Sequence, residues 1–168
     1  MSAPIPIREA EGGRDLALAR ELFVEYAASL PIDLCFQGFD EEVASLPGRY
    51  APPSGRLFLA GAPGEAVGCI ALRALDPPPE ALGGASAAPV GEVKRLYVRP
   101  VARGTGTGRR LAATVVDAAR AIGYRTLCLD TMRSMREARA LYASLGFATT
   151  HRYYGPPLDD IVYYAMKL

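Results

Sequence analysis

The sequence predicts an α/β domain with a mixed, partly antiparallel central sheet flanked by helices. Short runs rich in β-branched and aromatic residues alternate along the chain with longer runs whose apolar residues recur at helical spacing. The clearest strand and the clearest helix, Val93–Val98 and Gly108–Gly123, are joined directly by a glycine-rich turn. Such an alternation of strands and helices is typical of an α/β fold.

Composition narrows the classes of protein further. Half of the 168 residues are apolar, so we expect one compact domain over residues 1–168. The net charge of +1 gives no electrostatic argument for a nucleic acid or membrane partner, and no apolar run approaches membrane length. Cys35, Cys69 and Cys128 are scattered and odd in number, which favours free thiols in a reducing cytoplasm. His151 is the only histidine, and no spacing indicates a metal site.

The first part of the chain predicts one strand and two helices. We expect a short strand at Ile5–Arg8, followed by a helix at Arg14–Leu30 whose apolar residues share one face. Pro31 cannot continue that helix. A second, short helix is expected at Asp40–Leu46, with Asp40 as its N-terminal cap.

A hairpin and a long loop come next. Arg56–Ala62 and Ala66–Ala74 are strand-like, and the Pro-Gly turn between them predicts an antiparallel hairpin. Leu75–Pro89 is rich in proline and is expected to be a loop within the domain. In the central strand that follows, Lys94 and Arg95 are unusual for a buried position, so at least one must reach an edge, an anion or an acid.

The last part of the chain predicts a parallel strand, a helix and a final strand pair. Thr126–Asp130 should run parallel to the central strand, because a helix connects the two. Ser134–Glu137 fits a capping box at the start of a last helix that Gly146 ends. Ala148–Tyr154 and Ile161–Leu168 are typical of two final strands.

The glycine-rich turn is an expected anion site. Its glycines, Gly104, Gly106 and Gly108, precede a helix whose first backbone N–H groups lack intrahelical partners and lie at the positive end of the helix dipole. A backbone without β-carbons lets a phosphate approach these groups. The P-loop motif does not fit, since Arg109 and Arg110 stand where it requires Lys-Ser/Thr, and the glycine spacing also excludes the dinucleotide fingerprint.

The pattern that does fit is Arg-x-x-Gly-x-Gly, formed by Arg103, Gly106 and Gly108. Together with the preceding Leu-Tyr-Val-Arg-Pro run and the later segment Ala138–Phe147, it resembles the pyrophosphate loop and last helix of the GNAT superfamily of N-acetyltransferases. The resemblance covers Val90–Phe147 closely, and the order of elements extends it over most of the chain. Tyr153–Pro157 is similar to an acceptor-side loop in an uncharacterised bacterial branch of that superfamily.

The resemblance implies a cofactor and the residues that hold it. The cosubstrate would be acetyl-coenzyme A (acetyl-CoA), without a metal, and the sheet would splay between its fourth and fifth strands. The fourth strand would bind the pantetheine arm and the thioester through the main chain of Leu96, Tyr97 and Val98. The phosphates would lie on the loop, whose matching residues are Arg103, Gly104, Thr105, Gly106, Thr107, Gly108 and Arg109. Arg110 is an alternative to Arg109, since two adjacent arginines cannot both face one phosphate.

The resemblance also implies two catalytic residues. Tyr142 matches the tyrosine that protonates the leaving thiolate, and its alternative role is to pack the last helix. Glu92 is the candidate general base, acting through water, and its alternative is an ion pair with Lys94 or another basic neighbour. His151 has a suitable pKa for a base but is more typical of a surface histidine on a late strand.

One position departs from the family pattern, and the acceptor stays open. Met135 stands where many members carry an asparagine that contacts the cofactor, so that contact is either missing or made by Ser134 or Arg133. Gln37 and its aromatic neighbours are expected to cover the core rather than to contact an acceptor. The expected function is acetyl transfer to a primary amine of a small molecule or protein, and the alternative is a GNAT-fold module that binds acyl-CoA without turnover. The sequence leaves a homodimer open.

Overall fold

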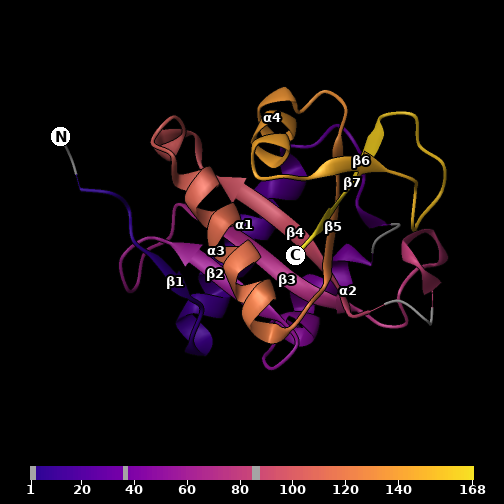
Figure 1. The fold of residues 1–168 in the computed structure, drawn as a ribbon. Helices are drawn as coiled ribbons and strands as arrows, with labels where there is room; N and C mark the ends of the chain where they lie inside the picture. The colour runs from indigo at the N-terminus through magenta and orange to yellow at the C-terminus, as the bar shows by residue number, and fades with distance from the viewer. Residues whose placement is uncertain (1–2, 36–37, 85–87) are drawn as a thin grey trace.

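The computed structural model describes residues 3–35, 38–84 and 88–168 and shows one sheet with helices on both faces (Figure 1). Its strands and helices, in chain order, are β1 (Ile7–Glu9), α1 (Gly12–Ala28), α2 (Phe39–Ala44), β2 (Arg56–Ala60), β3 (Gly68–Leu75), β4 (Val90–Val98), α3 (Thr107–Ile122), β5 (Thr126–Met132), α4 (Arg136–Ser144), β6 (Ala148–Thr150) and β7 (Ile161–Lys167). The seven strands pair in the order β1-β2-β3-β4-β5-β7-β6. Within the described ranges, no helix is long and apolar enough to cross a membrane.

The sheet is mixed, as expected, because β4 and β5 are parallel while every other neighbouring pair is antiparallel. β4 and β5 pair only over Val90–Glu92 and Thr126–Cys128. β4 then continues to Val98 and β5 to Met132 without pairing with each other, so the two strands separate. The splay between the fourth and fifth strands is therefore confirmed.

A β-bulge interrupts β4 just where it leaves β5. Cys69 pairs with Tyr97 and Ala71 pairs with Lys94, so Ile70 faces the two residues between them. The first of these, Arg95, has φ 61°, which is unfavourable for a residue with a side chain. The bulge bends the strand locally and re-aims the main chain of the residues after it.

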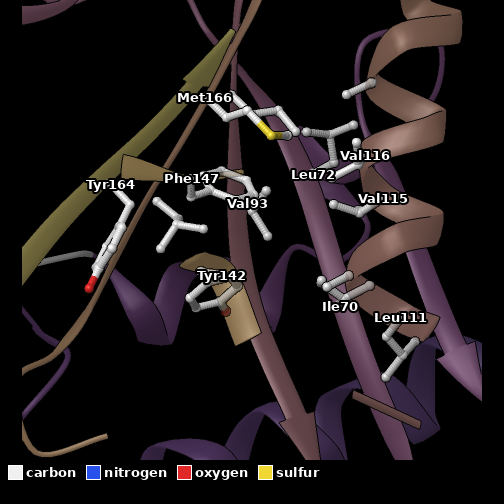
Figure 2. Close-up of a cluster of buried hydrophobic side chains, with 14 of the residues drawn as sticks. Ile70, Leu72, Val93, Leu111, Val115, Val116, Tyr142, Phe147, Tyr164 and Met166 are labelled. Atoms are coloured by element: carbon white, nitrogen blue, oxygen red, sulfur yellow. The ribbon is translucent and has the colours of Figure 1, made fainter. Parts of the chain in front are cut away.

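Two apolar cores lie on opposite faces of the sheet. α3 covers one face and packs on a cluster that includes Ile70, Leu111, Val115 and Tyr142 (Figure 2). α1 and α2 lie on the other face, behind the sheet in Figure 1, over a second cluster that includes Phe23. The strands are buried on both faces because helices cover both.

The starts of two helices differ from the sequence-based expectation. α2 begins at Phe39 after Gly38, so Asp40 lies inside the first turn and does not cap it. α4 begins at Arg136 after Met135, and no side chain caps it, so the capping box at Ser134 was wrong. In both cases a polar residue near the predicted start suggested a cap that the backbone conformation does not use.

The strand ends also differ. β6 stops at Thr150, so the chain from 151 to 160 is a connection and not part of the final strand pair.

Residues 85–87 of the proline-rich loop and Gln37 lie outside the described residues. The hairpin, the parallel β5 and the helix after the glycine-rich turn are where the sequence predicts them.

Candidate active site

A groove of about 790 Å³ runs along the side of the domain where β4 ends. Its walls come from the end of α1, the second half of β4, the glycine-rich turn and the start of α4. Eight of the predicted cofactor residues line it: Leu96, Tyr97, Val98, Arg103, Gly104, Gly106, Thr107 and Gly108. Thr105 and Arg109 lie outside the lining, and their contact with a cofactor stays a prediction.

The glycine-rich turn has the backbone shape that an anion site requires. Gly104 and Gly106 have φ 75° and 78°, a left-handed conformation that residues with side chains rarely adopt. A β-carbon at either position would meet no atom within 4 Å, so the space beside the backbone is open. Gly106 is the N-cap of α3, which places the unpaired N–H groups of the first helical turn beside this space.

The arginines near the turn have different roles. Arg103 lines the groove, while its Nε donates to the Val98 carbonyl. Arg109 donates to Ser144 on α4, and Arg110 donates to the Ile5 carbonyl, so both side chains hold neighbouring elements together. Arg136, at the start of α4, also lines the groove and was missed by the sequence analysis. The signal in the sequence that could have found Arg136 is its position directly after Met135, where the family pattern places a cofactor contact.

The structure also bears on which residue could replace the family asparagine at Met135. Ser134 and Met135 both line the groove. The guanidinium of Arg133 instead donates to the Asp159 carbonyl, away from the groove lining. Of the two replacements considered for the family asparagine, the geometry therefore favours Ser134.

A second, small cavity of about 30 Å³ lies in the gap between β4 and β5. It shares Tyr26, Leu96 and Met132, among others, with the lining of the groove. Its remaining walls come from β4, β5 and the segment after α1, and include Lys94, Asp130 and other residues of those elements. The groove and the cavity therefore meet where the two strands separate.

Tyr142 of α4 borders the small cavity but is not part of the groove lining. Its ring packs against Phe147 and Tyr164 (Figure 2). Burial raises the pKa of the Tyr142 phenol well above its usual value of 10. Burial likewise raises the pKa of Tyr26 to about 12. Both hydroxyls therefore carry their protons at neutral pH.

Glu92 is fully buried on β4 and does not line either cavity. Its Oε1 accepts a hydrogen bond from Arg73 Nε at 2.8 Å, and the Arg73 Nη2 lies 2.6 Å away. Its Oε2 accepts a hydrogen bond from the Tyr153 hydroxyl at 2.8 Å. The ion-pair alternative is thus present, with Arg73 in place of Lys94, and the role of Glu92 as a base stays a prediction.

The two basic residues of the central strand both reach acids, as expected. Lys94 Nζ lies 3.0 Å from Asp130 Oδ1 across the gap between β4 and β5. Arg95 Nε donates to Glu42 of α2 at 2.7 Å, which ties the bulge to that helix. Burial by itself would raise the pKa of Asp130, but the Lys94 ammonium and its hydrogen bond outweigh burial and hold that pKa below its usual range.

The remaining candidates lie apart from the cavities. His151 is exposed in the connection after β6 and does not line either cavity. The cysteines are free thiols, of which Cys69 and Cys128 are buried. In the described part of the chain, no cluster of acidic, histidine or cysteine side chains could hold a metal ion.

The comparisons with known proteins agree with this geometry. The model of the acetyltransferase (GNAT) family matches residues 19–147. An uncharacterized N-acetyltransferase of Schizosaccharomyces pombe is 35% identical over 156 residues, which cover 92% of this chain and 90% of that one. The aminoglycoside N(6′)-acetyltransferase type 1 of Stenotrophomonas maltophilia is 33% identical over 123 residues, covering 71% and 78%.

The fold is also similar to that of solved acetyltransferases. A GNAT family acetyltransferase from Elizabethkingia anophelis, solved with acetyl-CoA bound, superposes with a TM-score of 0.60. The match covers 99% of this chain and 100% of that chain at 22% identity.

Proposed function

Because the chain belongs to the acetyltransferase (GNAT) family, we propose that it moves the acetyl group of acetyl-CoA to a primary amine of a small molecule or protein. We propose further that residues 1–168 act as one such domain and that the amine attacks the thioester directly. The observation that carries the proposal is the meeting of the groove and the small cavity at the split between β4 and β5. A cofactor in the groove and an amine in the cavity would meet there.

The groove fits the parts of acetyl-CoA in order. The phosphates would lie on the turn at Gly104 and Gly106, where the backbone is open and N–H groups converge. Arg103 and Arg136 both line the groove and would neutralise phosphate charge. The pantetheine arm would follow the unpaired edge of β4 toward Leu96, where main-chain N–H and C=O groups no longer pair with β5.

The chain's own groups would serve the transfer in two places. The thioester oxygen gains negative charge as the amine attacks, and a main-chain N–H of β4 at the bulge would donate to it. The amine nitrogen forms a bond to the acetyl carbon, the carbon–sulfur bond breaks, and the thiolate takes a proton. Tyr142, which lines the cavity and carries its proton at neutral pH, would supply that proton.

The base that would remove the amine proton is Glu92. Glu92 lies on β4, four residues before Leu96. It would have to act through water, because its carboxylate is held by Arg73 and Tyr153. That arrangement also suits a purely structural ion pair.

A screen of amines tests the proposed function. Purified protein is mixed with acetyl-CoA and single primary amines, and release of the coenzyme A thiol is followed together with the mass of the product. We expect thiol release that depends on both protein and amine, with an acetyl group added to the amine. Acetyl-CoA binding without thiol release from any amine would instead support the non-catalytic acyl-CoA-binding alternative.

A further inference from the structure

Three buried ion pairs lie on the sheet face that α1 and α2 cover, and three of their six residues, Lys94, Arg95 and Asp130, line the small cavity. They join Arg73 with Glu92, Lys94 with Asp130, and Arg95 with Glu42. All six side chains are at most 13% exposed. Three cations and three anions balance, so this group of described residues carries no net charge.

This balance bears on the acceptor. Polyamines and aminoglycosides carry several positive charges and require a site with surplus negative charge, because an unbalanced charge is costly to bury. Here each carboxylate already has a cation in contact with it. An acceptor that keeps the group balanced must itself be neutral overall, although it carries the ammonium group that becomes the attacking amine.

The Lys94–Asp130 pair is the one that can meet such an acceptor. Both residues line the small cavity, and they come from the two strands whose separation forms it. Their charged atoms are 3.0 Å apart, so a molecule in the cavity that contacts one can contact the other. A molecule with an ammonium and a carboxylate on the same carbon matches both groups at once.

The residues that line the cavity indicate what kind of side chain the acceptor carries. Met132 and Ile161 belong to an apolar cluster beside the pair, with Leu30 and Ile32 packed against it. Those four residues also line the cavity. An apolar side chain would therefore fit next to the charged pair.

We propose that the acceptor is an α-amino acid with an apolar side chain, whose carboxylate is bound by Lys94 and whose amino group is bound by Asp130. The inference rests on the proposed function and names the substrate class of the same site. The chemical step is unchanged: after the nitrogen has lost a proton, it forms the bond to the acetyl carbon and the carbon–sulfur bond breaks. The product is an N-acetyl amino acid that retains its carboxylate.

The acceptor needs more room than the cavity offers, since about 30 Å³ is the space of about one water molecule. The ring of Tyr154 lies over Lys94, with Nζ 5.1 Å from the ring centre and 3.3 Å from the hydroxyl. Tyr154 belongs to the connection between β6 and β7; its carbonyl accepts a hydrogen bond from the Tyr163 hydroxyl, and its side chain also donates a hydrogen bond to Asp130. Movement of this ring would uncover Lys94 for the acceptor's carboxylate.

A comparison of three acceptors tests the inference on the unmodified protein. L-leucine, L-leucinamide and spermidine are each assayed with acetyl-CoA by thiol release. Leucinamide keeps the amine and the side chain and lacks only the carboxylate. We expect kcat/KM for leucine to exceed that for leucinamide by about 10- to 100-fold, as for the loss of one hydrogen bond to a charged group.

Each other outcome is decisive. Leucinamide or spermidine acetylated as well as leucine, or better, overturns the inference and leaves the proposed function standing. Thiol release with none of the three, but with other amines in the screen, overturns only the inference. Bound acetyl-CoA without thiol release from any amine contradicts the proposed function as well.

A variant pair assigns the effect to Lys94. Lys94→Gln removes the charge but can still donate to Asp130, and Lys167→Gln is the matched control. Lys167 lies on β7 and donates to Thr126, outside the cavity lining. We expect Lys94→Gln to lower kcat/KM for leucine far more than for leucinamide, so that the ratio of the two falls toward one, with the affinity for acetyl-CoA unchanged. Equal losses for leucine and leucinamide would indicate a structural role and overturn the inference. If the variant fails to fold, the three-acceptor comparison still decides.

Discussion

Tyr142 is, at the scale of one residue, both a core side chain and the proposed proton donor. The core around it excludes water, and this raises the pKa of the phenol and keeps the proton on the oxygen. Its ring fills space between Phe147 and Tyr164, so the side chain serves packing as well. The sequence left the packing and acid roles open; the structure shows the packing, and the acid role stays a proposal.

Tyr142→Phe separates the two roles. The ring and its packing stay, so the free energy of unfolding should change by less than about 1.5 kcal/mol. Loss of the positioned acid should lower kcat by about 100-fold, with little change in acetyl-CoA affinity. Tyr124→Phe is the control, because Tyr124 is equally buried and donates its hydrogen bond to Ser54, outside the cavity linings. Full activity in Tyr142→Phe would leave water as the proton source.

Glu92→Gln tests the proposed base. The change leaves Arg73 buried without its closest anion, so the protein should lose about 3 kcal/mol of stability. If Glu92 is also the base, kcat/KM should fall most at low pH, where the amine is mostly protonated. The double variant Glu92→Gln/Arg73→Met removes both charges and should restore stability. Activity that returns with stability would assign Glu92 to the ion pair alone.

At the scale of elements, α1 shapes the site because its last turns line both cavities. Its other end is fixed by Asp15, which accepts hydrogen bonds from the Arg8 side chain and from the Glu11 N–H. The hydrogen bond from Arg8 is the largest influence on the pKa of Asp15 and, with the Glu11 N–H, holds it below the usual value despite burial. This contact joins β1 to α1 and so sets how α1 lies against the sheet.

The sign of the pH effect follows from that lowered pKa. Asp15 contributes its stability above the unfolded pKa of about 3.9, and the contribution is lost as pH falls through the lower folded value. Asp15→Asn should reduce the free energy of unfolding by about 1 kcal/mol at pH 7. The difference from the parent should shrink below about pH 4. Asp117→Asn is the control, since Asp117 is 78% exposed, and it should have little effect at any pH. Parallel stability curves for Asp15→Asn and the parent would contradict the account.

The glycine-rich turn and the helix after it were the elements that the sequence predicted best. Their signals are local: glycines at alternate positions, then apolar residues at helical spacing. The start of α4 was predicted less well, because a serine three residues before a glutamate fits a capping box whether or not the backbone uses it. Arg136 was missed because its place in the groove depends on tertiary packing, which no local sequence pattern indicates.

At the scale of the whole molecule, the order of elements and the mixed sheet followed from the sequence, but the contacts between distant elements did not. Lys94 and Arg95 required acids, yet nothing in the sequence chose Asp130, 36 positions away, or Glu42, 53 positions away. The bulge at Arg95 likewise depends on pairing with β3. These contacts place Lys94, Arg95 and Asp130 at the cavity where the acceptor is proposed to bind. The class of acceptor could therefore not be inferred from the sequence.

The central claim is that acetyl-CoA binds in the groove with its phosphates on the glycine-rich turn. Gly106→Asp would put a carboxylate into the open space at the N-terminus of α3. Gly123→Asp is the control, because Gly123 caps the other end of the same helix, also with positive φ and open space.

Calorimetric titration of acetyl-CoA into the parent and both variants tests the claim most directly. We expect the parent and Gly123→Asp to bind one equivalent with similar affinity. Gly106→Asp should stay folded and bind at least about 30-fold more weakly, since charge-assisted hydrogen bonds worth about 2 kcal/mol or more are lost. Unchanged affinity in folded Gly106→Asp, or no binding by the parent, would contradict the account.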